Sequence, residues 1–171
     1  MHHDHFVIGY NVIVRYVALC GLVIKTDLSA GSGFGYQASK LGDAEIIFIM
    51  GGMNDSWGGV SDRATLETNV GYVFNYVRGN HPEADVYVVL HVLGPKPGIS
   101  EVVREVQREL ALKFGFTVVD CEDGGAVLAE MNAAGKDHPM ATVMTNYANR
   151  VVAAFTANQE RRAAPSATGV C

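Results

Sequence analysis

Short runs rich in Val and Ile recur along this chain, and segments with helical periodicity separate them. The runs do not alternate strictly between polar and apolar residues, which is typical of strands covered on both faces. They occupy residues 21–28, 44–50, 84–93 and 116–121. Strands that alternate with helices predict a parallel sheet with helices on both sides. In sheets of this kind, ligands bind beyond the carboxyl ends of the strands.

The segment 61–80 has the periodicity of an amphipathic helix. Ser61 or Asp62 can cap its start, and Gly79 can end it. The residues predicted to share its apolar face are Leu66, Val70, Val73, Phe74 and Val77.

Two further helices are predicted downstream. One covers residues 100–115, with Ser100 as its cap, Gly115 as its stop, and an apolar face formed by Val102, Val103, Val106 and Leu110. The other runs from about Ala141 to Gln159, and its inward-facing residues are Tyr147, Val151 and Phe155.

The composition limits the classes of protein to which the chain can belong. Of its 171 residues, 49% are hydrophobic and 18% charged, so one domain can bury a core of its own. We assign that domain to residues 1–162 and a flexible tail to residues 163–171. A net charge of −5 with scattered Lys and Arg argues against nucleic-acid binding. No segment approaches the roughly 18 unbroken apolar residues of a membrane span.

The N-terminal apolar stretch, residues 6–24, is interrupted by Asn11 and Arg15, so we assign no signal peptide. The compartment therefore stays open between cytoplasmic and secreted. The cysteines lie far apart, are odd in number and lack metal-ligand spacing. We therefore expect unpaired thiols, no metal site and no cofactor. They are Cys20, Cys121 and Cys171.

An apolar run leads into the sequence MGGMNDSWGG at residues 50–59, which is more polar than a strand exit requires. Asn54 and Asp55 can form a turn, since both side chains hydrogen-bond their own main chain. Alternatively, Asn54 points its side-chain N–H at a developing oxyanion, which is worth roughly 3 kcal/mol in the transition state, and Asp55 braces the loop. Ser56 and Trp57 can line the rim of that pocket, or Trp57 can pack over the loop.

The glycine-rich segment 28–36 follows the first apolar run. It is either a flexible strand-to-helix turn or a close backbone approach, in which the N–H of Gly31 or Gly33 points into the same pocket. Neither of its serines has the G-x-S-x-G context of a nucleophile elbow.

Three histidines lie near the ends of predicted elements. His138 stands just before the last helix and can be a general base or an ordinary helix lead-in. His91 is expected to be a structural histidine at a strand end, with its hydrogen bonds satisfied. His81 is expected to be a loop residue.

A glycine loop after an early strand, G-x-N-D after the next (52–55) and His-Pro before the last helix come in a recognisable order. In this the chain resembles the SGNH (GDSL-like) hydrolases over nearly its whole length. The resemblance implies a flavodoxin-like three-layer α/β/α sandwich with a parallel sheet. Members of the family are mostly esterases, lipases and carbohydrate deacetylases. It also implies that Asn54 is the amide donor to the oxyanion, Gly31 the backbone donor and His138 the base.

Two positions depart from the family pattern. The serine block is best matched by HDHFVIGYN at residues 3–11, where Asp4 matches the family Asp and His5 takes the place of the nucleophilic serine. In the family an acidic residue three positions before the base orients it. Here that position, three residues before His138, is occupied by Gly135.

The family has a central hydrophobic strand before its serine block, and here only residues 1–3 precede Asp4, which matches the family Asp. Either residues 5–14 supply a substitute strand, or the chain lacks its native start, so the first strand is expected to be missing or altered. The explanations left open are a truncated or aberrant reading frame, a pseudoenzyme, an unusual active site and a different alignment of the N-terminus.

The sequence therefore predicts an SGNH-type hydrolase of carboxylic ester bonds, in which the nucleophilic serine is replaced by His5 or lost by truncation. Its partner is a small-molecule ester or an acetylated carbohydrate, and the sequence does not indicate an oligomeric state. The alternative is a catalytically inactive binding module on the same fold. A weaker alternative is an unrelated flavodoxin-like domain that binds an anion at the glycine-rich segment.

Overall fold

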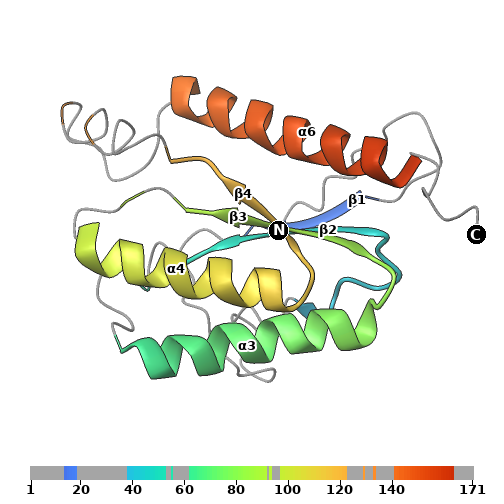
Figure 1. The fold of residues 1–171 in the computed structure, drawn as a ribbon, viewed down its shortest axis with the longest axis horizontal. Coiled ribbons are helices and arrows are strands. Elements are labelled where there is room, and N and C mark those ends of the chain that lie inside the picture. The colour runs from blue at the N-terminus through green and yellow to red at the C-terminus, as the bar shows by residue number, and fades with distance from the viewer. Residues whose placement is uncertain are drawn as a thin grey trace, which may run out of the picture.

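The computed structural model describes residues 14–18, 38–52, 55, 62–91, 93, 97–122, 129, 133 and 141–163. Its four-stranded sheet has the order β1-β2-β3-β4, and every pair of neighbours is parallel. The strands are Val14–Ala18 (β1), Ile46–Gly51 (β2), Asp85–Leu90 (β3) and Thr117–Asp120 (β4). Helices α3 (Arg63–Asn80) and α4 (Pro97–Lys113) cover one face of the sheet, and α6 (Ala141–Ala163) covers the other (Figure 1). The predicted three-layer α/β/α sandwich with a parallel sheet is confirmed.

The first described strand, β1, begins at Val14 and pairs with β2 from Val14 opposite Ile46 to Ala18 opposite Met50. It includes the last residue of the segment 5–14 that was considered as a substitute strand, and the rest of that segment lies outside the described residues. The run at 21–28 lies outside the described residues. Because β1 and β3 flank β2, the described sheet leaves no gap beside the strand that leads into the G-x-N-D block.

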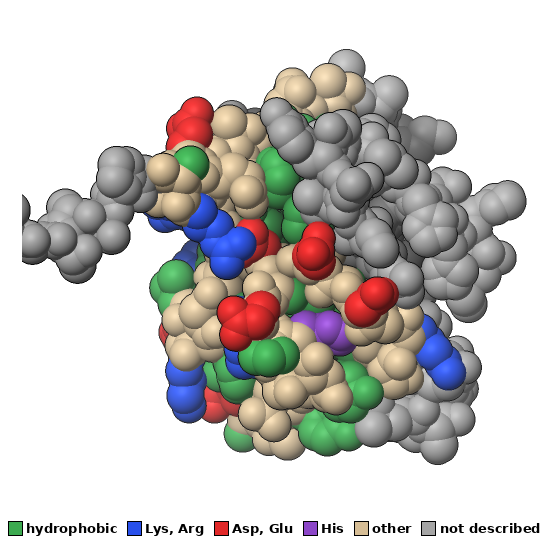
Figure 2. Space-filling view, turned by 90° about the vertical axis from the view of Figure 1, so that its right-hand side faces the viewer, with side chains coloured by type: hydrophobic (Ala, Val, Ile, Leu, Met, Phe, Trp, Pro, Cys, Tyr) green, Lys and Arg blue, Asp and Glu red, His purple; other side chains and the backbone are tan. Residues whose placement is uncertain are grey.

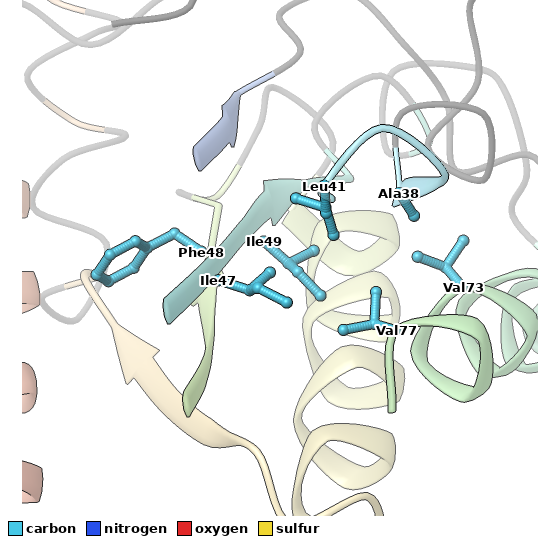
Figure 3. Close-up of a pocket in the computed structure, with 7 residues that line it drawn as sticks. All are labelled: Ala38, Leu41, Ile47, Phe48, Ile49, Val73 and Val77. Carbon is cyan, nitrogen blue, oxygen red and sulfur yellow. The ribbon is translucent and has the colours of Figure 1, made fainter. Parts of the chain in front are cut away.

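Each face of the sheet has its own apolar core. Ile47 and Ile49 of β2 face α3 and α4, whereas Phe48 points to the α6 side and stacks on Tyr87. Figure 3 shows this alternation around a small apolar cavity of about 20 Å³. All six residues of β3 are buried, as expected of a strand covered on both faces.

Helix α3 buries the five residues predicted for its apolar face. Asp62 caps its start by accepting a 2.8 Å hydrogen bond from the Thr65 N–H. The prediction for its end was wrong: the helix passes Gly79, stops at Asn80, and places His81 at its C-cap. Gly79 has no positive φ and so does not terminate the helix.

Helix α4 starts earlier than predicted and ends as predicted. Ser100 is fully buried inside the first turns rather than a cap, because Pro97 already begins the helix. Gly115 has a φ of +70°, and its N–H bonds to the Leu112 carbonyl while the Phe116 N–H bonds to the Ala111 carbonyl. These two bonds form a Schellman motif that closes the helix.

Helix α6 packs inward through Tyr147, Val151 and Phe155, as predicted. It continues past Gln159 and ends at Ala163, the first residue of the predicted tail. Residues 164–171 lie outside the described part of the chain. No described helix is long and apolar enough to cross a membrane.

Candidate functional site at the carboxyl edge of the sheet

β2, β3 and β4 end at Gly51, Leu90 and Asp120, on the edge of the sheet where α4 begins (Figure 1). This is the edge at which ligands bind in parallel α/β sheets. The predicted site residues lie outside the described part of the chain, so their convergence on one pocket stays a prediction. They are His5, Gly31, Asn54, Ser56, Trp57 and His138. Of the G-x-N-D block, the structure describes Gly52 and Asp55.

Gly52 is the first residue after β2, and its position explains why the block begins with glycine. Its φ is +105°, a conformation that residues with a side chain rarely adopt. A Cβ at this position would lie 2.8 Å from Gln107 Nε2 and 2.9 Å from Val103 Cγ1 of α4. The backbone beyond β2 therefore lies directly against α4, and any larger residue would push the two apart.

Asp55, at the other end of the block, is fully buried. Its burial fits the expectation that this carboxylate braces the loop rather than facing a ligand. In the sequence, Asn54 thus lies between Gly52, whose backbone packs against α4, and the buried Asp55.

Gln107 is a site residue that the sequence did not indicate. Its side chain is almost completely buried, and its Nε2 donates a 2.9 Å hydrogen bond to the carbonyl oxygen of Gly51. Gln107, Arg104 and Ser100 are buried polar residues that recur at helical spacing on α4. Their regular spacing beside the apolar face of the helix is the sequence signal that could have indicated a second buried face.

His91 directly follows β3 and differs from the prediction. Only 4% of the residue is exposed, and within the described part of the chain no group hydrogen-bonds its Nδ1 or Nε2, nor the Oε1 of Gln107. The expectation of a satisfied strand-end histidine is therefore not met among these residues. A buried polar atom without a partner costs roughly 1–3 kcal/mol, so this cluster is a strained feature of the interior.

The surroundings of His91 keep its imidazole neutral. Burial lowers its pKa to about 4, and the positive charge of Arg104 acts in the same direction. The Gln107 side chain lies beside the ring and opposes this lowering of the pKa, although the two residues do not meet hydrogen-bond geometry.

A network of charged groups lies next to His91 and joins α4 to the ends of β3 and β4. Arg104 donates to the His91 carbonyl and, across 2.6 Å, to Asp120; Arg108 donates to the other Asp120 oxygen, also across 2.6 Å. Burial alone would raise the pKa of Asp120, but hydrogen bonds from Arg104, the Glu122 N–H and Arg108 hold it below its usual value. Glu122 in turn accepts the Leu93 N–H, so the network reaches the loop after β3.

Among the described residues, we find neither a reactive cysteine nor a metal-binding cluster at this edge. Burial raises the pKa of the Cys121 thiol to about 11, so it is not a thiolate at neutral pH. Among the described residues, no group of three His, Cys, Asp or Glu side chains could hold a metal ion.

A larger hollow of about 520 Å³ lies at the opposite edge, at the amino ends of β2 and β3. Figure 2 shows this face, where acidic side chains gather around a histidine. The hollow is lined by Asp43, Glu45, His81 and Glu83, with Asp85 bound by Gln159 and Arg162. Its position at the amino ends of the strands is not where this fold class binds substrates.

Comparison with known proteins supports the fold. No protein-family profile matches the sequence, and no curated protein matches it. Among solved structures, a carbohydrate esterase family 3 protein from Talaromyces cellulolyticus matches with a TM-score of 0.61 and 15% identity, over 72% of this chain and 64% of that one. This chain thus spans less than two thirds of that protein's length.

Two more solved structures resemble the chain. A member of the lipolytic G-D-S-L family from Veillonella parvula matches with a TM-score of 0.53 and 21% identity, over 71% of this chain and 72% of that one. A peptidoglycan O-acetylesterase matches with a TM-score of 0.51 and 18% identity, over 71% of this chain and 39% of that one. These likenesses show that the chain has an SGNH/GDSL-like fold.

Proposed function

We propose that this chain is an SGNH-type hydrolase that cleaves carboxylic esters, either small acyl esters or the acetyl esters of carbohydrates. The observation that carries this proposal is the turn at Gly52, whose backbone lies against α4 at the carboxyl edge and leads into Asn54. The names of the similar structures, two esterases and a lipolytic protein, support an ester as the substrate.

In this mechanism Asn54 donates its side-chain N–H to the oxyanion that forms when the ester carbonyl is attacked. The backbone N–H of Gly31 is the second donor, and His138 takes the proton of the attacking group. Donors of this kind are worth roughly 3 kcal/mol each in the transition state. Ser56 and Trp57 contact the acyl or sugar portion at the rim.

The position of β1 bears on where the attacking group lies. In the family the nucleophile follows the central strand, and β1, which pairs with β2, ends at Ala18. His5 precedes β1, so chain order favours the residues from Leu19 onward over His5 as the nucleophile block. Cys20 is the first nucleophilic side chain after the strand. This supports a different alignment of the N-terminus from the one that places His5 at the serine position.

The proposal is tested by the hydrolysis of p-nitrophenyl acetate by the full chain and by H138A, C20A and H5A. We expect turnover by the wild type and a loss of at least about 100-fold in H138A, since general-base catalysis contributes roughly 10²–10⁴-fold. A matching loss in C20A or in H5A identifies the nucleophile. Turnover that is unaffected by all three substitutions would contradict the proposed site.

A catalytically inactive binding module is the second candidate. Under the alignment that places His5 at the serine position, the loss of the nucleophile favours it. Gly135 in place of the orienting acid favours it as well. This candidate predicts no turnover above the buffer rate. It also predicts that acetylated oligosaccharides bind the chain in calorimetry and that the same oligosaccharides without acetyl groups do not. Hydrolysis that H138A abolishes would exclude it.

A further inference from the structure

The interior just below the Gly51–Gly52 turn contains a cluster of polar atoms that the proposed mechanism does not use. Both ring nitrogens of His91 and Oε1 of Gln107 are buried and find no hydrogen-bond partner among the residues that the structure describes. The two side chains come from different elements, the end of β3 and the middle of α4, and meet beneath the end of β2. An apolar pair would fill the same volume without leaving polar atoms unpartnered, so packing alone does not explain their presence.

The geometry relates both side chains to the same short stretch of backbone. Gln107 Nε2 donates to the Gly51 carbonyl across 2.9 Å. A Cβ on Gly52 would lie 2.8 Å from the same nitrogen and 3.4 Å from His91 Nδ1. Gln107 therefore holds the Gly51 carbonyl, and Gln107 and His91 together occupy the space that a side chain at Gly52 would need.

The chemistry of the pair explains how the orientation of the amide is selected. The Gln107 amide can bind the Gly51 carbonyl only through its nitrogen, which leaves Oε1 on the other side. A neutral imidazole has one N–H donor, and Oε1 is the unpartnered acceptor beside it. The hydrogen bond to Gly51 thus selects the amide orientation in which the nitrogen faces that carbonyl, and Gln107 acts to raise the His91 pKa from beside the ring.

We propose that Gln107 and His91 are positioning residues: they fix the Gly51–Gly52 backbone against α4 and so set the direction in which Asn54, two residues later, presents its amide. This inference rests on the proposed function, because it gives Asn54 the role of oxyanion donor. Neither Gln107 nor His91 contacts the substrate in this account.

The kinetic test is a double-mutant cycle with Q107L and N54A on p-nitrophenyl acetate. We expect Q107L to lower kcat about 10- to 100-fold and to leave KM within about twofold, because the lost stabilisation is specific to the transition state. In the N54A background, Q107L should have almost no further effect on kcat. If the two losses multiply instead, Gln107 does not act through Asn54 and the proposal is wrong.

The matched control is Q159L, which removes a comparable hydrogen bond, from Gln159 to Asp85, at the opposite edge of the sheet. It should leave kcat unchanged. An equal loss of kcat in Q159L would mean that the effect of Q107L is general destabilisation, and would overturn the proposal. H91L should lower kcat as Q107L does. If H91L has the same kcat as the wild type, His91 is not a positioning residue.

A second measurement does not depend on activity. Hydrogen–deuterium exchange of the peptide that covers residues 50–55 should be at least about tenfold faster in Q107L than in the wild type, and unchanged in Q159L. If the wild type does not hydrolyse esters, the proposed function fails, while this exchange experiment still decides whether the brace exists. Unchanged exchange in Q107L would contradict the brace whatever the activity.

Discussion

The side-chain amide of Gln107 donates a hydrogen bond to the carbonyl oxygen of Gly51, so α4 directly holds the end of β2. These residues lie 56 positions apart in the sequence. The backbone that leads to Asn54 is consequently fixed by a helix as well as by the sheet.

Replacing Gly52 with Ala should destabilise the protein by about 3 kcal/mol, because a Cβ would clash with Gln107 and Val103 at a φ that disfavours side chains. Chemical denaturation monitored by circular dichroism measures the loss. Gly79 is the matched control: it is helical and has nothing within 4 Å of an added Cβ. G79A should stabilise the protein by about 0.5–1 kcal/mol. Equal stabilities of G52A and the wild type would contradict the described turn.

His91 should make the protein less stable as the pH falls. Its folded pKa of about 4 lies below its ordinary value of 6.5, so between these values the unfolded chain binds a proton that the folded chain does not. The free energy of unfolding therefore decreases from about pH 6.5 to pH 4, by roughly 3 kcal/mol in total. H91L should flatten this part of the stability curve.

The control for His91 is H81Q. Burial also lowers the pKa of His81, but that side chain lies at the opposite edge of the sheet. H81Q should therefore retain most of the pH dependence. Identical slopes in H91L and the wild type would show that the imidazole is protonated in the folded state without cost.

Replacing Arg104 with Met should cost about 2–3 kcal/mol, because the His91 carbonyl and one Asp120 oxygen would lose a buried charged donor. Arg108 would still bind Asp120, which keeps the loss below that of a fully isolated buried charge. Arg63, whose ion pairs with Glu67, Glu105 and Glu109 are exposed, is the comparison. R63M should cost less than about 1 kcal/mol. Similar losses in thermal denaturation would contradict a structural role for the buried network.

The apolar cavity between β2 and α3 offers a stabilising substitution. Val73 is one of the side chains that point toward it in Figure 3, and the cavity measures about 20 Å³. V73I adds one methylene group and should raise the free energy of unfolding by up to about 0.8 kcal/mol. A decrease would mean that the region is already fully packed and that the longer side chain is strained.

The sequence predicted the sheet and the helix faces well because burial recurs at regular spacing. The five apolar residues of α3, from Leu66 to Val77, are all buried, and β3 is covered on both faces. Local signals were less reliable at helix ends. Ser100 has the chemistry of a cap, yet Pro97 starts the helix first, and Gly79 remains helical.

β1 lies within a stretch from which the sequence alone does not single out one strand. Residues 6–24 form one long apolar stretch, and composition alone does not show which part of it pairs with β2. The pairing of Val14–Ala18 is a non-local contact that the sequence does not encode in any periodicity.

For the candidate site, the G-x-N-D pattern indicated a glycine turn after the strand and an Asp55 that braces the loop, which the burial of Asp55 fits. The contributions of Gln107, His91 and Arg104 do not follow from that pattern, since each depends on contacts with distant segments. A single glutamine on an amphipathic helix does not show by itself whether it is buried or exposed. Only the polar spacing of Ser100, Arg104 and Gln107 on α4 hinted at this face.

The central claim is that Asn54 supplies an oxyanion donor at the carboxyl edge of the sheet. The most direct measurement is the steady-state hydrolysis of p-nitrophenyl acetate by the wild type and by N54A, with thermal denaturation to confirm that both are folded. The account predicts wild-type turnover and a loss of about 10²–10³-fold in kcat for N54A with little change in KM. A folded N54A that retains the kcat of the wild type would contradict it.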